Sequence, residues 1–371
     1  MDKINKKLLV LVGLILIILS FNISSIATAD IFNKSISKSV GNMVIPRSGH
    51  STFLMNDGRV LVVGGSGPST YSAEIYDPKT KKFKLAGKLN QWRSHEETIT
   101  MLKNGKVLIT GGSDGIKQDF KSAELFDPQT GKSENLEDMH FYRTGHTATL
   151  LQDGKVLIVG GIKKAELFDP ETNKFSIIPN EMIFPHYNHS SILLNDGNIL
   201  IVGGPTDLAE IFYPKTNKFK EVGKMNFKRT LPILIPLENN KIFVFGGYDP
   251  DTKFVSKSEI YDISSGTFYI PKIDKYPDNK ENRLAIKVDE DKILFVGGCA
   301  GLGTAFTQLS DIYLLDLEAG SYKFLGSMKN KRDLASVTRL NKYNYLVTGG
   351  WISYKTLSSA EIINLFNIWE K

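Results

Sequence analysis

Charged residues recur at regular spacing along this chain of 371 residues. Arginine heads one short segment after another, and histidine takes its place once. The positions are Arg47, Arg93, Arg143, His186, Arg229 and Arg332. Three segments carry a further histidine three residues later, namely His50, His146 and His189. Guanidinium groups bind carboxylates and sulfates through paired hydrogen bonds, so a ring of such residues could hold an anionic ligand.

Carboxylates recur at a second set of positions. These are Glu74, Glu124, Glu166, Glu210, Glu259 and Glu361, and we take Asp311 as the seventh. In one interpretation the arginines form a positive ring around a binding site. In the other, each Arg or His bonds to neighbouring backbone or to one of these carboxylates, and recurs because the repeat does. The sequence leaves both interpretations open.

Aromatic residues lie beside the Arg and His positions or in the loops that follow the repeats. Trp92, Tyr142 and Tyr187 belong to the first group, and Tyr248, Trp351 and Tyr354 to the second. Exposed rings beside charged donors suit sugar stacking or peptide anchoring, whereas buried rings would pack loops onto the fold. We expect Trp351 to be exposed. The candidate binding residues are Trp92, Arg93, Arg143, His146, Arg229, Tyr248, Arg332 and Trp351.

The elements that must position these residues are clearest between Arg143 and Pro170. Two apolar runs, His146 to Leu151 and Lys155 to Val159, flank an Asp-Gly turn that suits a tight hairpin. A Gly pair ends the second run. An alternating segment, Ala165 to Pro170, predicts a third strand, and Lys174 to Ser176 opens a fourth. One unit therefore predicts four antiparallel strands.

The Gly pair marks seven such units, at intervals of 43 to 52 residues. The pairs are Gly64-Gly65, Gly111-Gly112, Gly160-Gly161, Gly203-Gly204, Gly246-Gly247, Gly297-Gly298 and Gly349-Gly350. From about Ser37 to Phe366 this pattern resembles the kelch-repeat family. The resemblance implies an all-β protein, a seven-bladed β-propeller with four-stranded antiparallel blades.

The two ends of the repeat region complement each other. Ser37 to Met43 (SKSVGNM) resembles the fourth-strand segment Phe219 to Met225 (FKEVGKM), yet no first three strands precede it. The last unit supplies three strands and then stops. We therefore predict that the N-terminal strand completes the C-terminal blade and closes the ring.

One face of such a ring varies more than the other. The Asp-Gly hairpins and Asp-Pro turns share one face and are short, whereas the loops after the Gly pairs share the other face with the connections between blades. Loops after Gly65, Gly112, Gly247, Gly298 and Gly350 are long, and those after Gly161 and Gly204 are short. The variable-loop face is therefore the expected working face, with a notch at blades three and four.

The N-terminal region has the composition of a secretory signal peptide. Lysines precede an apolar stretch, and Ala27-Thr28-Ala29 supplies small residues for cleavage. We predict a signal peptide at 1–29, or an uncleaved membrane anchor at residues 4–21, and one propeller domain at 30–371. The protein is then secreted or held at the cell surface. The net charge is +6, of which the signal segment supplies +2 (three Lys and one Asp), and the remaining +4 is mild and favours no nucleic-acid partner.

The resemblance extends to enzymes, which gives a second class of function. Galactose oxidase resembles this chain in its repeat, but its family places a copper-site cysteine at the start of a first strand. The only cysteine here, Cys299, follows a Gly pair instead. Enzymes of the sialic-acid mutarotase type also resemble it, and need only an Arg and an acid or base. We expect no metal, no cofactor and no marked catalytic residue, and we expect a protein or cell-envelope glycan, including anionic ones, as the partner.

Overall fold

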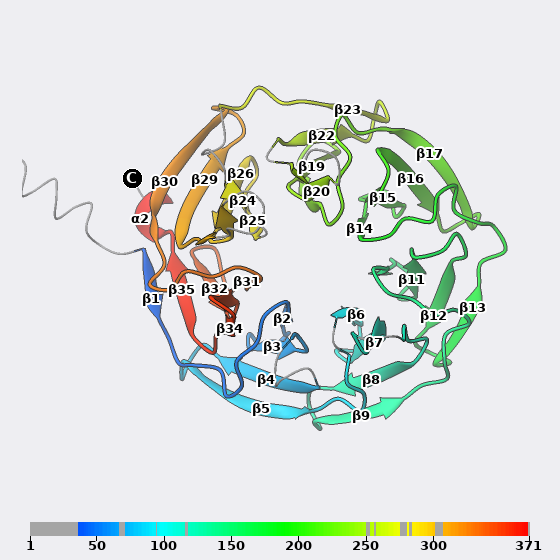
Figure 1. Ribbon diagram of the computed structural model, residues 1–371, viewed down its shortest axis with the longest axis horizontal. Helices are drawn as coiled ribbons and strands as arrows, with labels where there is room; N and C mark the ends of the chain where they lie inside the picture. Colours follow the sequence, from blue (N-terminus) through cyan, green and yellow to red (C-terminus); the bar gives the residue numbers. More distant parts are fainter. Residues whose placement is uncertain are drawn as a thin grey trace, which may run out of the picture. The chain divides into compact units, whose positions relative to one another are not determined.

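The described residues form seven four-stranded antiparallel sheets that follow one another as blades around a common axis (Figure 1). The computed structural model describes residues 36–66, 71–93, 95–115, 118–249, 253–255, 257–274, 280–281, 284–300 and 307–369. Residues 37–371 form one unit. The predicted signal segment, 1–29, lies outside the described residues. No helix in the described ranges is long and apolar enough to cross a bilayer.

Blades one to four take their four strands consecutively along the chain. Blade one consists of β2 (Ser51–Leu54), β3 (Val60–Val63), β4 (Ser72–Asp77) and β5 (Lys82–Lys88), and blade two of β6 (His95–Met101), β7 (Val107–Ser113), β8 (Ala123–Asp127) and β9 (Lys132–Asn135). Blade three consists of β10 (Thr147–Leu150), β11 (Val156–Val159), β12 (Glu166–Asp169) and β13 (Lys174–Ile177), and blade four of β14 (His189–Leu193), β15 (Ile199–Gly203), β16 (Leu208–Tyr213) and β17 (Lys218–Lys224).

Blades five to seven carry short extra strands in their loops. Their main strands are β18 (Ile233–Leu237), β19 (Lys241–Phe245), β22 (Glu259–Asp262) and β23 (Thr267–Tyr269); β25 (Ala285–Asp289), β26 (Lys292–Val296), β29 (Asp311–Asp316) and β30 (Ser321–Ser327); and β31 (Ser336–Arg339), β32 (Asn344–Thr348), β35 (Ala360–Asn364) and β1 (Ser37–Ser39). The extra strands are β20 (Tyr248–Asp249), β21 (Lys253–Phe254), β24 (Lys280–Glu281), β27 (Cys299–Ala300), β28 (Thr307–Gln308), β33 (Trp351–Ile352) and β34 (Lys355–Thr356), and a short helix α2 (Phe366–Trp369) follows β35.

The core lies between neighbouring blades. The second strand of each blade is apolar on both faces because another blade covers each face; every residue of β3 and β11 is fully buried. One cluster, for example, joins Leu108 and Leu125 of blade two to Val156, Ile158 and Phe168 of blade three. Burial of this kind is the main force that holds the blades side by side.

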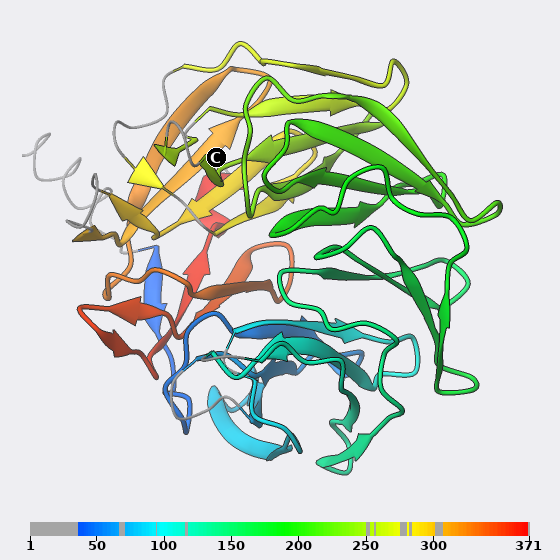
Figure 2. The same cartoon turned by 45° about the vertical axis from the view of Figure 1, so that its right-hand side comes forward.

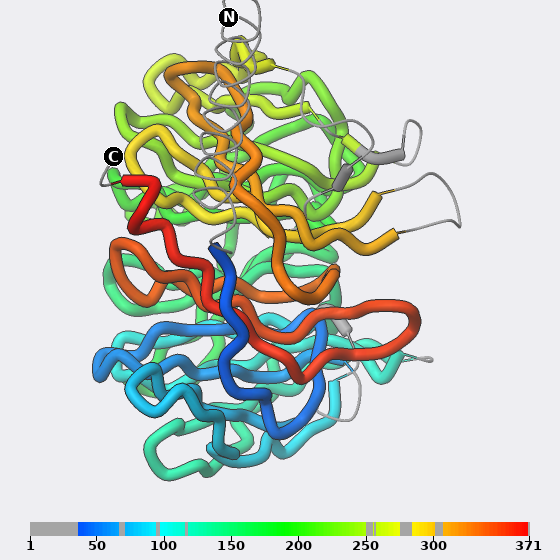
Figure 3. The backbone as a smooth tube through the Cα atoms, turned by 90° about the vertical axis from the view of Figure 1, so that its left-hand side faces the viewer, coloured from blue at the N-terminus to red at the C-terminus, as the bar shows by residue number. Residues whose placement is uncertain are grey.

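The N-terminal strand closes the ring, which confirms the prediction. Strand β1 is the outer strand of blade seven and pairs antiparallel with β35, with Ser37 opposite Ile363 and Ser39 opposite Glu361. Figure 3 shows β1, in blue, running beside β35, in red. The seventh sheet therefore has its four strands, and both ends of the repeat region share it.

The extra strands all lie on the variable-loop face. Six of them extend the loops after the Gly pairs of blades five, six and seven, and β24, in the connection into blade six, pairs with β27. Figure 2 shows the β33–β34 hairpin, in red, extending beyond its own blade. In blades three and four, by contrast, the chain passes from Gly161 to β12 and from Gly204 to β16 within a few residues. The rim is therefore tall over one part of the ring and low over another.

Candidate functional site

The recurring Arg, His and Glu residues pair with each other inside the blades. The five arginines of this set are at most 1% exposed, and their Glu partners are fully buried. The nearest N···O distances are 2.9 Å for Arg47–Glu74, 3.6 Å for Arg93–Glu124, 3.2 Å for Arg143–Glu166, 3.0 Å for His186–Glu210, 2.8 Å for Arg229–Glu259 and 2.8 Å for Arg332–Glu361. We call this arrangement the Arg/His–Glu network.

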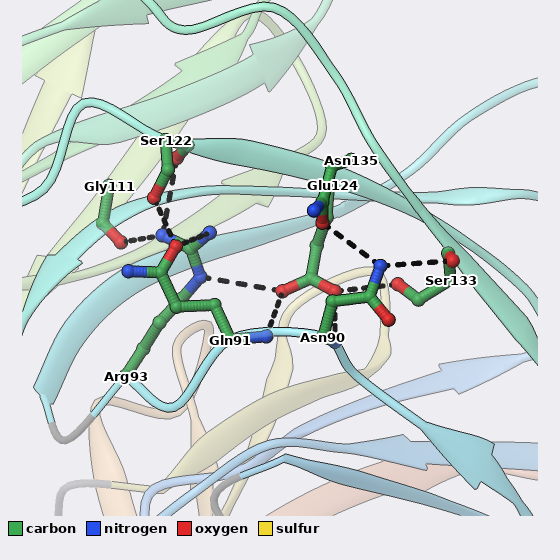
Figure 4. A network of polar contacts seen from close by, with 8 residues as sticks. All are labelled: Asn90, Gln91, Arg93, Gly111, Ser122, Glu124, Ser133 and Asn135. Carbon is green, nitrogen blue, oxygen red and sulfur yellow. Dashed lines mark hydrogen bonds and ion pairs between the residues drawn. The ribbon is translucent and has the colours of Figure 1, made fainter.

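Figure 4 shows the copy of the network in blade two. The guanidinium of Arg93 donates to the carbonyl oxygens of Gly111 and Ser122 and pairs with Glu124. Burial, the largest influence, lowers the pKa of Arg93, and the charge of Glu124 opposes this shift. The carbonyl of the first glycine of the Gly pair accepts in the other copies too, at 2.8 Å from Arg143 and 2.6 Å from His186.

Each carboxylate also binds the main chain that arrives from the preceding blade. Glu74 accepts from the amides of Val44 and Ile45 at 2.7 and 3.0 Å. Glu210 accepts from those of Ile183 and Phe184 at 2.9 and 2.8 Å. The network therefore ties the end of one blade to the third strand of the next. This geometry favours the structural interpretation of the recurring residues, because the guanidinium groups of Arg93, Arg143, Arg229 and Arg332 lie in the protein interior instead of facing solvent.

The second histidine set is buried between blades. The Nε2 atom of His50 lies 2.7 Å from Thr348 Oγ1 of blade seven, and that of His189 lies 2.8 Å from Thr147 Oγ1 of blade three. Burial, reinforced by nearby Arg47 and Arg332, lowers the pKa of His50 to about 3. Burial and the charges of Arg143 and Arg93 lower the pKa of His146 equally, to about 3. His146, a predicted binding residue, is thus an interior residue that bridges Thr98 and Thr110 of blade two.

In blades two, three and seven these imidazole rings lie against the first glycine of the Gly pair. A Cβ placed on Gly160 would lie 2.3 Å from Cε1 of His189, and one on Gly349 would lie 2.8 Å from Cε1 of His50. Both glycines also have positive φ, at 102° and 58°. In these three blades the Gly pair therefore ends the second strand where the imidazole of the next blade approaches the backbone.

The substitution Gly160→Ala is expected to lower the free energy of unfolding by about 2 to 4 kcal/mol, since it adds overpacking against His189 to left-handed strain. Gly58→Ala is the matched control. Gly58 has φ 83°, and a Cβ added there would have no atom within 4 Å, so that variant should lose only about 1 kcal/mol from strain. Urea unfolding of both variants measures the difference, and equal losses would show that the imidazole contact is unimportant.

Blade six departs from the network, and the prediction that Asp311 is the seventh carboxylate of the set is wrong. In the other blades the Glu lies three residues before the residue that ends the third strand, as Glu74 does before Asp77. The residue at that position in blade six is Tyr313, three before Asp316. Asp311 instead pairs with Ser327, in the register that Ser72 occupies in blade one. Blade six also differs at the position that Arg or His holds in the other blades. In blades one, five and seven the residue after the Arg pairs with the residue after the Gly pair, as Thr230 does with Tyr248. Since Glu281 pairs with Cys299 in blade six, Lys280 takes the position of the Arg.

Several of the aromatic residues named from the sequence face solvent, whereas the arginines of the network are buried. Trp92 is 46% exposed, Tyr142 55% and Tyr248 41%. Trp351, which we expected to be exposed, is half-buried, because it packs edge-on against Tyr354 with ring centroids 5.6 Å apart. Of the predicted binding residues, Trp92, Tyr248 and Trp351 therefore lie on the variable-loop face with accessible surface. Tyr354 and Tyr142, left out of that candidate set, are more exposed still.

A pocket of about 360 Å³ opens on the same face at blade four. It is lined by Phe184, Pro185, His186, Pro205, Thr206, Asp207 and Lys228. The lining comes from the connection into β14, the short loop after Gly204 and the connection into β18. The pocket coincides with the low rim, so the short loops leave a hollow on the face that carries the exposed aromatic residues.

Sequence comparison identifies part of the repeat region. A family model described as Kelch motif matches residues 46–90 and 103–140. Kelch-like protein 15 of Danio rerio is 27% identical over 161 residues, which cover 35% of this chain. The match spans 26% of that relative's length. These matches coincide with a ring of seven blades, each marked by a Gly pair. The chain contains kelch motifs and folds as a seven-bladed β-propeller.

Solved structures share the propeller fold at low sequence identity. A fungal alcohol oxidase of the AA5 family, solved in complex with copper, has a TM-score of 0.72 and 16% identity, covering 89% of this chain and 76% of that chain. The structure of YjhT has a TM-score of 0.54 and 13% identity, covering 86% of this chain and 95% of that chain. At these identities the likeness concerns the fold alone.

The described part of this kelch propeller does not fit a copper site. No three His, Cys, Asp or Glu residues of that part lie close enough together to hold a metal ion. Cys299 is buried in β27, directly after a Gly pair. The Nε2 atoms of His50, His146 and His189 bond to threonine hydroxyls within the core, so these rings serve packing between blades.

Proposed function

We propose that this propeller is an exported binding module that recognises a partner protein through its variable-loop face. The observation that carries the proposal is the difference between charged and aromatic residues. The recurring charged side chains are buried in the Arg/His–Glu network, whereas Trp92, Tyr142 and Tyr248 present rings to solvent on the variable-loop face, which also has the pocket at blade four. Aromatic anchors and a nearby hollow are typical of protein-binding surfaces.

A sugar-modifying function is the second candidate, and the geometry gives it less support. Isomerisation of an acidic sugar needs an accessible Arg together with an acid or base. Within the described residues, the arginines that head the blades are at most 1% exposed and already hold carboxylates of the protein. The accessible rings also suit stacking on a glycan, and the cell-envelope extract used in the test below offers glycans as well as proteins.

Trp92 and Tyr142 are the residues to replace first. The double variant Trp92→Ala, Tyr142→Ala should retain less than a tenth of the partner that the wild type captures from a cell-envelope extract, because truncating aromatic anchors typically costs about 2 kcal/mol or more. Its melting temperature should stay within about 2 °C, since exposed rings contribute little to folding.

Leu54→Ala provides the matched control. Leu54 is 44% exposed and lies at the hairpin end of β2, on the opposite face. Capture by this variant should equal that of the wild type. Loss of capture with Leu54→Ala, or unchanged capture with the double variant, would refute the assignment of the binding face. Mass spectrometry of the exported protein tests cleavage of the proposed signal peptide.

A further inference from the structure

Large apolar residues in left-handed backbone conformation mark one part of the variable-loop face. The residue two positions after the Arg or His head has positive φ in five blades. Blades one and three place Gly49 and Gly145 there, and blade four places Asn188, with φ of 62°, 58° and 52°. Blades five and seven place Leu231 and Leu334 there, with φ of 53° and 51°. A leucine in this conformation costs about 1 to 2 kcal/mol relative to its usual backbone geometry.

Burial does not offset the strain at these leucines. Leu231 is 61% exposed and Leu334 is 38% exposed. Their backbones continue a chain of hydrogen bonds between blades, in which Gly49 donates to the carbonyl of Leu334 and Leu231 donates to that of Asn188. Since glycine or asparagine satisfies the same backbone role elsewhere in the ring, the fold itself gives no reason for leucine.

A third case lies at the tip of the β33–β34 hairpin. Ser353 and Tyr354 form its two-residue turn, with φ of 46° and 65°. Such turns favour Asn-Gly, yet the second position holds a tyrosine that is 90% exposed. On the opposite face, left-handed positions are filled by Lys81, Asn173 and Asn217. Strained apolar residues are thus confined to the variable-loop face among the described residues.

The two leucines adjoin aromatic residues of the neighbouring loops. Thr230, next to Leu231, forms a β-bridge with Tyr248, and Asp333, next to Leu334, forms one with Trp351. Blades five and seven therefore each present a leucine beside an aromatic ring. Strain of this kind persists at functional sites because the function, and not stability, selects the residue.

The charges around these residues define the partner. In the described loops of blades five and seven on this face, the exposed charged side chains are all lysines: Lys228, Lys257, Lys329, Lys331 and Lys355. The acids of these loops that the structure describes, Asp249 and Asp333, are 7% and 6% exposed. A complementary partner segment would present apolar side chains beside carboxylates.

We propose that Leu231, Leu334 and Tyr354, with Tyr248 and Trp351, are the contact points for a partner protein segment that carries apolar side chains flanked by Asp or Glu. This inference rests on the proposed binding function and adds to it contact points in blades five and seven, together with the partner chemistry that suits them. Lysines around the contact points attract the acidic flanks, and the strained residues hold their side chains toward the partner.

The test uses a displayed library of random 12-residue peptides, selected on the purified full-length exported protein. Selected peptides should be enriched in Leu, Phe or Trp next to Asp or Glu. The triple variant Leu231→Gly, Leu334→Gly, Tyr354→Gly should bind the best synthetic peptide at least tenfold more weakly, while its melting temperature stays the same or rises because glycine relieves the strain. The matched control is Lys81→Gly, Asn173→Gly, Asn217→Gly, which makes the same backbone change on the opposite face and should bind normally.

The outcomes separate this inference from the proposed function. If selected peptides lose affinity with Trp92→Ala but not with the triple glycine variant, the variable-loop face binds and the present inference is wrong. If the opposite-face triple variant loses affinity instead, both proposals fail. Enrichment of basic peptides, or a library that yields no binder, would also overturn the inference.

Discussion

The substitution Glu361→Ala is expected to lower the free energy of unfolding by about 3 to 5 kcal/mol, because it leaves a buried arginine without its counter-charge. Glu361 joins three parts of the ring. It pairs with Arg332 at 2.8 Å, accepts from the amides of Lys329 and Asn330 at 2.7 and 3.0 Å, and accepts from Ser37 Oγ at 2.6 Å. Its loss therefore weakens the junction with blade six and the closing strand β1 together.

The pKa of Glu361 agrees with this role. Burial alone would raise the pKa of Glu361, but the hydrogen bonds from Ser37 and Lys329 and the charge of Arg332 hold it below its ordinary value. A lowered folded-state pKa means that the stabilisation is present above the unfolded-state pKa and is lost as the pH falls through the folded-state value. The energetic contribution of this carboxylate is therefore fully available at neutral pH.

Urea unfolding at pH 7 measures the effect of Glu361→Ala. The control is Glu221→Ala, which removes an exposed carboxylate from the outer strand β17 and should change stability by less than about 0.5 kcal/mol. A loss below about 1 kcal/mol for Glu361→Ala would contradict the assignment of the Arg/His–Glu network as the link between blades.

The second large effect is expected on acidification. His50, His146 and His189 are buried, and burial is the main cause that lowers the pKa of each; for His50 and His146 the value is about 3. The unfolded chain binds protons at these residues below its pKa of about 6.5, whereas the folded ring does not. Each histidine then costs about 1.4 kcal/mol per pH unit as the pH falls from about 6.5 toward 3, so three together cost about 4 kcal/mol per unit.

We therefore expect the propeller to unfold cooperatively between about pH 6 and pH 4, as followed by circular dichroism and urea titration. The variant His146→Ala should reduce the slope of stability against pH by about 1.4 kcal/mol per unit. Alanine suits this position because blade seven has Ala335 at the equivalent place, three residues after its Arg. Tyr248→Ala, which removes an exposed ring, should leave the slope unchanged. A wild-type stability that stays constant from about pH 7 to pH 4 would show that these histidines are protonated in the folded ring.

The repeat pattern predicted the architecture because each blade packs against similar blades, and this packing constrains the sequence of every blade in the same way. The Gly pairs located seven second strands, and the segment at Ser37 predicted the strand that closes the ring. Both signals are local, since each depends on a turn or a strand of a few residues. Because the fold is built from similar units, these signals recur along the sequence.

The roles of the charged residues could not be read from the same pattern. Arg93 and Arg143 look alike as anion-binding residues and as buried partners of Glu124 and Glu166, because burial depends on how blades meet and not on local sequence. The mistake over Asp311 has a similar cause. Loops of variable length precede the third strand, so its register is found only by counting back from Asp316, which leads to Tyr313.

The strained leucines were missed because their signal lies in backbone geometry. The sequence shows Gly, Gly, Asn, Leu and Leu two positions after the heads of five blades, and only the φ angles reveal that all five share one conformation. Glycine and asparagine tolerate this conformation, which gave a clue at Leu231 and Leu334, but these residues fall inside connections that vary between blades.

Closure by β1 also fixes an order of events during synthesis. Ser37 and its partner Glu361 are separated by 324 positions, so the first strand of the ring cannot pair until the segment that carries Glu361 has left the ribosome. Until then the growing polypeptide lacks its most distant contact, and contacts of such long range form slowly. A polypeptide that cannot close its ring early can still pass through a translocation channel in an unfolded state, which suits the export proposed above.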